Sequence, residues 1–349
     1  MRKSKQEDKL FPMIRDYLTD YLPNKRFYSP NTIEAYRIAL NLFLDFICAS
    51  NSLKLYQVTF ELITSDMLSR FLDWLEQERQ CSPTTRNHRL ACIRAFYKYV
   101  GTMDITLAAF RQNIMKVPLK KTEITKTIKF LDEDALRVLL QQPDPLKLNG
   151  FRDLFYMVLM YDTGCRNQEI LDLKLQNFCA AEKNPYVIVT GKGNKTRTVP
   201  IMAKTIQYFE KYTQLFHKDM VSDRYLFYVK SNGLFQQMSP DNVARFMRIY
   251  GENASEAGAL IPGKLHPHML RATRAMHLYR AGMPLALLSE WLGHANLETT
   301  MIYAYADTEM KRQAILKATS PENPLKTADL DFAPQIKDSQ LMKTLYGLQ

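Results

Sequence analysis

The chain has 349 residues, of which 46% are hydrophobic and 24% are charged. These fractions are ordinary for a folded water-soluble protein and exclude global disorder. Forty-seven Lys and Arg against 36 Asp and Glu give a net charge of +11. The excess favours a polyanionic partner, and a generally basic protein without such a partner is the alternative.

The compartment is predicted from three absences in the sequence. No apolar stretch approaches the roughly 18 residues that span a bilayer, and no apolar run follows the basic N-terminus as it would in a signal peptide. Five scattered cysteines form no CxxC pair, which excludes a zinc motif and a disulfide framework. We therefore expect a protein of the reducing cytoplasm with no membrane partner.

The first hundred residues are predicted to be helical. Apolar residues recur at three- and four-residue spacings in three segments, residues 31–47, 64–79 and 82–100. Ser29 precedes a proline at the start of the first segment, and Thr64 or Ser65 caps the second. Gly101 is expected to close this helical block.

Basic side chains stand between the apolar residues of the third segment. They include Arg86, Arg89 and Arg94. A basic helical face is usually only a solvated face, but on a basic protein it is also how phosphate contacts are presented. We take these three arginines as candidate DNA contacts.

A second domain is predicted to begin near residue 130. Residues 106–129 are rich in Lys and Thr and are expected to form an exposed basic linker. Asp132 then caps a helix. Two β-branched runs, 186–190 and 197–201, are joined by GKGNK and predict a hairpin. The remaining segments are helical in pattern, and the tail at 319–349 ends in a short predicted helix.

Two tyrosines lie close together in LGHANLETTMIYAYAD. Residues two apart on a helix point in nearly opposite directions, so Tyr303 and Tyr305 cannot share a face. Leu297, Met301 and Tyr305 fall on one apolar stripe. This geometry predicts that Tyr305 is buried in the core and that Tyr303 projects elsewhere. The alternative for an off-stripe tyrosine is a surface position.

Several charged residues could share a site with Tyr303. His268 and Arg271 are spaced i, i+3 on one helical face. His294 follows a glycine that lets the backbone turn, and Arg166 begins a helix with Glu169 one turn later. Each has an ordinary explanation as a surface or capping residue, but together they suit attack on a phosphodiester.

The chemistry of such a set is phosphoryl transfer. Arginine forks can hold the non-bridging oxygens of a phosphate, and a tyrosine hydroxyl can be the covalent nucleophile. Lys192 at the hairpin tip can protonate the leaving oxygen, with Lys195 in the same turn as a rival. No metal or other cofactor is required.

The ordered motifs TGCRNQEI, GKGNKTRTVPI, HPHMLR and LGHANLETTMIYAY resemble the tyrosine recombinase (phage integrase) family, most closely its Xer-like and transposon-encoded members. The resemblance is strong from about residue 130 to 310. The segments that begin SPNTIEAYRIAL and SPTTRNHRLACI resemble the helical core-binding region of the family.

The resemblance implies a role for each matched residue. Arg166 and Arg271 would bind the scissile phosphate, Lys192 would protonate the leaving group, and Tyr303 would attack. His268 and His294 would assist, and Glu169 would support Arg166. Lys195 and Arg274 are added as candidate DNA contacts.

The implied fold is mainly α with a small β-sheet or hairpin, in a two-domain C-shaped DNA clamp. Its parts would be an N-terminal arm (1–8), a helical SAM-like core-binding domain (9–105), the linker (106–129), a catalytic domain (130–318) and the tail (319–349). Four protomers would act on double-stranded DNA with an inverted-repeat core site. They would exchange strands through a 3′-phosphotyrosine and a Holliday junction. The tail helix would dock within its own subunit or on a neighbour.

The implied role is integration or excision of a mobile element by a cytoplasmic, nucleoid-associated recombinase. Xer-type chromosome dimer resolution is one alternative. A type IB topoisomerase would use the same chemistry to relax DNA. A helical DNA-binding protein without activity would leave the ordered motifs unexplained.

Overall fold

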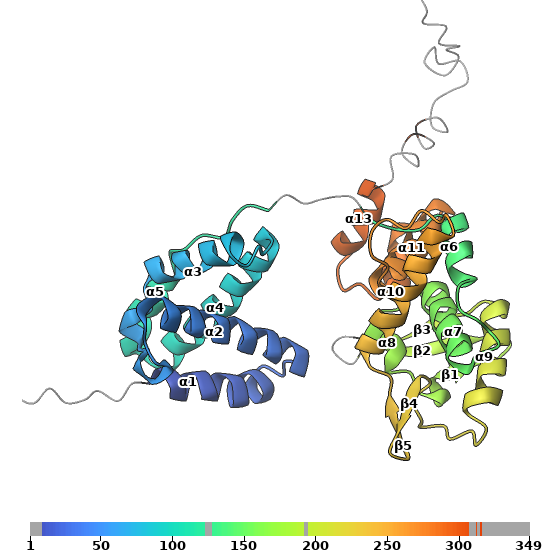
Figure 1. Ribbon diagram of the computed structural model, residues 1–349, viewed down its shortest axis with the longest axis horizontal. Helices are drawn as coiled ribbons and strands as arrows, with labels where there is room; N and C mark the ends of the chain where they lie inside the picture. Colours follow the sequence, from blue (N-terminus) through green and yellow to red (C-terminus); the bar gives the residue numbers. More distant parts are fainter. Residues whose placement is uncertain (1–8, 123–127, 192–194, 307–311, 313–314, 316–349) are drawn as a thin grey trace, which may run out of the picture. The chain divides into compact units, whose positions relative to one another are not determined.

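The computed structural model describes residues 9–122, 128–191 and 195–306, together with 312 and 315. The chain divides into two compact units, Met1–Thr125 and Lys126–Gln349 (Figure 1). Each unit buries its own apolar cluster. None of the helices in the described ranges has the length and apolar character needed to cross a membrane.

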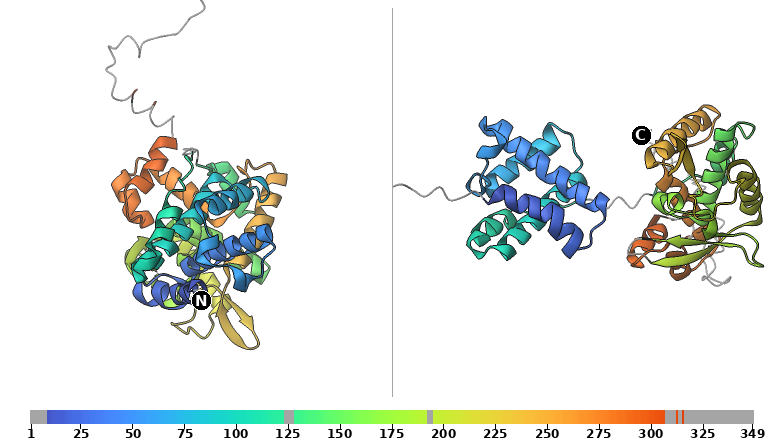
Figure 2. Two further views of the ribbon diagram at one scale, coloured as in Figure 1. Left: turned by 90° about the vertical axis from the view of Figure 1, so that its left-hand side faces the viewer. Right: turned by 90° about the horizontal axis from the view of Figure 1, so that it is seen from below.

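The first unit is a bundle of helices (Figure 2). Its elements are α1 (Leu10–Asp16), a π-helical turn η1 (Tyr17–Lys25), α2 (Pro30–Asn51), the short 3-10 turns η2 (Leu55–Gln57) and η3 (Phe60–Leu62), α3 (Ser65–Gln77), α4 (Pro83–Met103), η4 (Ile105–Leu107) and α5 (Ala108–Met115). The three predicted helical segments are confirmed as α2, α3 and α4. Ser29 and Ser82 cap α2 and α4 with their hydroxyls, each followed by a proline, and Thr64 caps α3.

Two predictions for the end of the first unit are wrong. Gly101 does not close the helical block, because α4 continues to Met103. A Cβ at Gly101 would lie 2.9 Å from Cδ of Arg111, so the glycine instead lets α5 pack closely on α4. The predicted linker at 106–129 is wrong in its first part, since it contains α5, and Ile114 is fully buried.

The second unit is mainly helical with two small sheets, which confirms the predicted mainly α fold with a small β-sheet. Its helices are α6 (Glu133–Leu140), α7 (Leu148–Thr163), α8 (Asn167–Leu171), the 3-10 turn η5 (Leu175–Asn177), α9 (Ala203–Phe216), α10 (Pro240–Glu256), α11 (Pro267–Arg280), α12 (Leu285–Leu292) and α13 (Glu298–Ala306). Asp132 caps α6 by accepting a hydrogen bond from the Ala135 amide at 2.7 Å, as predicted. Helix α7 is central and packs against α6, α9 and α11.

The predicted hairpin is confirmed as β2 (Tyr186–Thr190) and β3 (Thr196–Pro200), which pair antiparallel with Val189 opposite Arg197. A short strand β1 (Phe178–Cys179) completes this sheet. A second hairpin, β4 (Tyr228–Ser231) and β5 (Leu234–Gln237), was not predicted. Each strand begins with two adjacent apolar or aromatic residues and ends with polar ones, YVKS and LFQQ, so the apolar residues do not alternate.

Candidate active site

The site is built around the C-terminal end of α12. The last carbonyls of a helix have no partner within it, and cations are stabilised there. Three successive carbonyls of this end each accept from a different arginine. Trp291 O accepts from Arg197 Nε at 3.1 Å, Leu292 O from Arg271 Nη2 at 2.8 Å, and Gly293 O from Arg166 Nη2 at 3.0 Å.

Gly293 shapes this end of the helix. It adopts φ +65°, the left-handed region that favours glycine. A Cβ at this position would lie 2.8 Å from Nη1 of Arg197. Any side chain at residue 293 would therefore push on the guanidinium that caps α12.

A second helix end lies opposite. Helix α7 ends at Gly164, which has φ +62°, and the Gly164 carbonyl accepts from Arg271 Nη1 at 2.7 Å. Arg271 thus joins the ends of two helices and is only 1% exposed. Burial, followed by the charge of Arg166, lowers the pKa of Arg271 to about 10, so it remains protonated at neutral pH.

Glu169 holds two of the arginines. Its carboxylate accepts from Arg166 Nη1 at 2.7 Å and from the Arg166 amide at 2.8 Å. The support predicted from the i, i+3 spacing is therefore present. Arg197 donates to the same carboxylate at 2.9 Å and 3.2 Å. Burial acts to raise the pKa of Glu169, but the bonds from Arg197 and Arg166 outweigh it and hold the pKa below its usual range.

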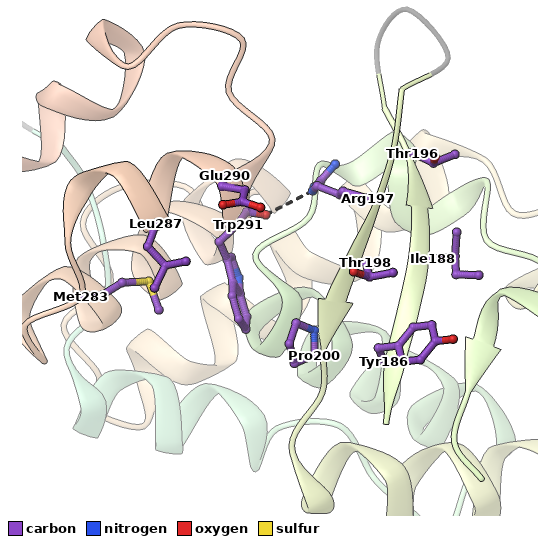
Figure 3. A pocket seen from close by; sticks show the side chains of 10 residues that line it. All are labelled: Tyr186, Ile188, Thr196, Arg197, Thr198, Pro200, Met283, Leu287, Glu290 and Trp291. Carbon is purple, nitrogen blue, oxygen red and sulfur yellow. Dashed lines mark hydrogen bonds between the residues drawn. The ribbon is translucent and has the colours of Figure 1, made fainter. Parts of the chain in front are cut away.

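Arg197 is the site residue that sequence reasoning missed. It lies on β3, on the same side as the buried Val199 two residues later. Figure 3 shows Arg197 reaching from the strand toward α12, where it meets the carbonyl of Trp291. An arginine at an inward position of an alternating strand was the available signal, because a buried charge needs partners.

The two predicted histidines lie near the arginines. Nδ1 of His294 is 2.8 Å from the hydroxyl of Thr300, a residue that sequence reasoning also missed. Burial, then the charges of Arg271 and Arg166, lower the pKa of His294 to about 4. Partial desolvation and then Arg271 also lower the pKa of His268. Both rings are neutral at pH 7.

The predicted geometry of the two tyrosines is wrong. Tyr303 is 2% exposed and packs with Met276, Leu288 and Leu292, whereas Tyr305 is 48% exposed. The buried face of α13 carries Thr300 and Tyr303 rather than an apolar stripe. Hydroxyl groups face the site there, and apolar periodicity does not detect them.

Tyr303 nevertheless lies within the electrostatic reach of both predicted phosphate ligands. Burial raises the pKa of its hydroxyl, while the charges of Arg271 and then Arg166 act to lower it. Positive charge stabilises the phenolate that would attack a phosphorus atom. The structure thus gathers Arg166, Arg271, His268, His294 and Tyr303 in one region of the second unit.

The remaining predicted residues of the second unit are less central. Lys192 lies outside the described residues. Lys195 is exposed, and its carbonyl closes the hairpin turn by accepting from the Gly191 amide at 2.8 Å. Arg274 donates to the carbonyl and carboxylate of Asp162 at 3.1 Å and 3.3 Å. These bonds give Arg274 a structural role, and its DNA contact stays a prediction.

The predicted DNA contacts of the first unit also make internal contacts. Arg86 is 3.7 Å from the carboxylate of Glu76, and Arg89 donates to the Ala35 carbonyl at 3.4 Å. Arg94 donates to the carbonyls of Met115 and Val117 at the end of α5. Their contacts with DNA remain predictions.

The arrangement can bind a phosphate and present a nucleophile to it. Each guanidinium group donates some of its N–H groups to protein carbonyls. Its remaining N–H groups can donate to a bound phosphate. Neutral imidazoles can donate or accept a proton, and the tyrosine supplies an oxygen nucleophile. These are the properties of an enzyme that opens phosphodiesters through a covalent tyrosine adduct.

Comparison with known proteins agrees with this class. The model of the phage integrase family matches residues 129–310, and the model of the phage integrase N-terminal SAM-like domain matches residues 14–101. The chain is 30% identical to "Putative integrase/recombinase y4rC" of Sinorhizobium fredii, over 89% of this chain and 92% of that relative. It is 28% identical to tyrosine recombinase XerC of Chlamydia caviae, over 84% and 94% of the two chains.

Solved structures share the fold. The XerH site-specific recombinase bound to a palindromic difH substrate aligns with a TM-score of 0.63 at 22% identity, over 83% of this chain and 80% of that one. The Tn1549 transposon integrase in complex with transposon right end DNA aligns with a TM-score of 0.62 at 17% identity, over 88% and 99%. The chain belongs to the phage integrase family, and it is a site-specific DNA recombinase of the tyrosine type.

Proposed function

We propose that Tyr303 attacks a phosphodiester of double-stranded DNA held by Arg166 and Arg271. The phenolic oxygen forms a bond to phosphorus, and the bond from phosphorus to the 5′ oxygen breaks. The product is a 3′-phosphotyrosine and a free 5′ hydroxyl. Because the new ester retains the energy of the broken bond, the reverse attack by a 5′ hydroxyl of another strand rejoins the DNA.

The protons of this step have candidate carriers. The phenolic proton passes to a neutral imidazole, and His268 at the edge of the site is available for it because its pKa is lowered. The leaving oxygen takes a proton from Lys192, or from its rival Lys195. Arg166 and Arg271 stabilise the charge on the non-bridging oxygens.

The observation that carries the proposal is the set of three arginines on the end of α12 beside a buried tyrosine. Arg271 and Tyr303 are 1% and 2% exposed, whereas the Arg166 side chain is 40% exposed, so a phosphate reaches the group from the side of Arg166. Helix α13 packs on α11 and α12, and this packing holds Tyr303 beside the arginines.

The proposed substrate is a core site with inverted repeats, bound by a homotetramer that exchanges strands through a Holliday junction. The proposed role is integration and excision of a mobile element by a cytoplasmic, nucleoid-associated enzyme. Support comes from the relatives, which include an integrase/recombinase and, by fold, a transposon integrase bound to transposon DNA. Xer-type resolution is the second candidate, favoured by the XerC relative.

A nicked suicide substrate tests the central step, because loss of the short fragment beside the nick traps the covalent adduct. We expect an adduct with the native chain and with Tyr305→Phe, and none with Tyr303→Phe. An adduct that survives Tyr303→Phe but is lost with Tyr305→Phe would overturn the assignment. Recombination of two sites, compared with relaxation of supercoiled DNA, separates a recombinase from a topoisomerase.

A further inference from the structure

A buried hydroxyl touches the site without being part of the proposed chemistry. Thr300 is 0% exposed, and its Oγ1 lies 2.8 Å from Nδ1 of His294. Among the described residues, this is the hydrogen bond that the Thr300 side chain makes. Thr300 lies on α13, one helical turn before Tyr303.

The direction of this hydrogen bond follows from burial. A neutral imidazole carries one proton, on either Nδ1 or Nε2. If Nδ1 donated to Thr300, the hydroxyl proton of the threonine would be buried without an acceptor, which is unfavourable. If the hydroxyl donates to Nδ1, both groups are satisfied and the proton of His294 is on Nε2. The ring is neutral at pH 7, because burial and the nearby arginines oppose its protonation.

We propose that Thr300 is a positioning residue, which fixes His294 in the tautomer that carries its proton on Nε2. His294 then has one N–H available to donate to a phosphate oxygen and has no free lone pair with which to act as a base. The inference rests on the proposed function, because it takes the phosphate to lie beside Arg166 and Arg271.

The position of Thr300 adds a consequence. The hydroxyl that orients His294 and the hydroxyl that attacks belong to the same buried face of α13. His294 is therefore oriented only when the helix that carries the nucleophile is seated on α11 and α12. One docking event completes both parts of the site.

The test is a double-mutant cycle in single-turnover cleavage of the suicide substrate. Thr300→Val keeps the shape of the side chain but cannot donate. We expect cleavage to slow about 10- to 100-fold, by analogy with residues that orient metal-bound histidines through hydrogen bonds. Thr300→Ser restores the donor and should restore the rate. Thr299→Val is the matched control, since Thr299 is the exposed neighbour on the same helix.

The cycle distinguishes positioning from a general structural effect. If Thr300 acts through His294, Thr300→Val should cause no further loss in a His294→Ala background. The proposal is overturned if Thr300→Val cleaves at the native rate, or if it slows the His294→Ala variant by the same factor as the native chain. Thr300→Ala replaces the valine variant in the same cycle if the latter does not bind DNA.

A second measurement does not depend on cleavage. Nitrogen NMR of the free protein separates protonated from unprotonated ring nitrogens, and His294→Ala identifies the signals of residue 294. We expect the proton of His294 on Nε2 in the native chain and in Thr300→Ser. If the His294 ring of the native chain carries its proton on Nδ1, this inference is wrong, even if Tyr303→Phe remains unable to form the adduct. An adduct formed by Tyr303→Phe would instead contradict the proposed function, and the assignment of the His294 tautomer would be unaffected.

Discussion

Both units hold arginine side chains against carbonyls at the end of a helix. The units differ in how many arginines reach the helix end and in whether a carboxylate pairs with them. In the first unit, Arg94 alone reaches the end of α5, where it donates to the Met115 carbonyl at 3.1 Å and to that of Val117. In the second unit, arginines from three different elements reach the end of α12. In the described part of the chain, Glu169 is the carboxylate that pairs with this group.

The difference separates a structural cap from an anion site. One arginine at a helix end satisfies carbonyls and stabilises the local fold. Burial lowers the pKa of Arg271, and the nearby charge of Arg166 lowers it further, so these two guanidinium groups repel each other. Such a group is stabilised further when an anion such as phosphate binds. In the first unit Arg94 therefore stabilises the end of α5, and we propose that the arginines of the second unit bind phosphate.

The largest expected effect comes from Arg271→Lys. A lysine cannot reach the Gly164 and Leu292 carbonyls while also presenting a fork to phosphate. We expect cleavage of the suicide substrate at saturating DNA to fall about 1000-fold, with DNA affinity by fluorescence anisotropy little changed. A loss of DNA binding instead would mean that Arg271 is a docking contact.

Arg94→Lys is the matching change in the first unit. Its main effect should be on stability, with a loss of about 1–2 kcal/mol in the free energy of unfolding, measured by urea denaturation. Cleavage at saturating DNA should fall far less than with Arg271→Lys. Equal losses of cleavage from the two variants would break the comparison between the units.

The sequence predicts those parts of the molecule that depend on local spacing. The caps at Ser29 and Thr64 mark α2 and α3, and the i, i+3 spacing of Arg166 and Glu169 predicts their ion pair. The hairpin β2–β3 follows from its β-branched residues and its glycine turn. In each case the residues that interact are close in the chain.

The parts that the sequence did not reveal depend on distant contacts. Arg197 binds Glu169 across 28 positions and Trp291 across 94. Strand alternation could mark Arg197 as inward-facing, but no local pattern identifies such distant partners. Tyr303 was expected off the buried stripe, yet it is buried because α13 packs this face against Met276 of α11 and Leu288 and Leu292 of α12. Gly101 was taken as a helix end, although its role is the close approach of α5.

A smaller effect is expected from Glu169→Gln, which sharpens the comparison through pH. The amide cannot neutralise Arg166 and Arg197, so cleavage should fall about 10- to 100-fold. The folded pKa of Glu169 is below its ordinary value of 4.5. Its stabilisation is therefore present at neutral pH and is lost as the pH falls through that lowered value. Urea denaturation should show the largest difference between native and variant at pH 7, and a shrinking one in acid.

Asp104→Asn is the control for this pH effect. Hydrogen bonds from Lys9 and Thr106 lower the pKa of Asp104 to about 2, in the first unit. We expect this change to alter the acid stability of the first unit and to leave cleavage intact. A gap between native and Glu169→Gln that widens in acid would contradict the role assigned to the carboxylate.

The smallest expected effect is the contrast between two glycines. Gly293→Ala places a side chain in the left-handed region, at a cost of about 1–2 kcal/mol, and its Cβ pushes Arg197 away from Glu169. We expect cleavage to fall about tenfold, equivalent to about 1.4 kcal/mol. In the first unit, Gly101→Ala lies inside a helix, where alanine stabilises the folded state by about 0.5–1 kcal/mol relative to glycine. The new Cβ also forces Arg111 to shift, so the two effects on the free energy of unfolding nearly cancel. Cleavage unchanged by Gly293→Ala would show that Arg197 stabilises α12 without controlling Arg166, and would leave Glu169 as the residue that orders the site.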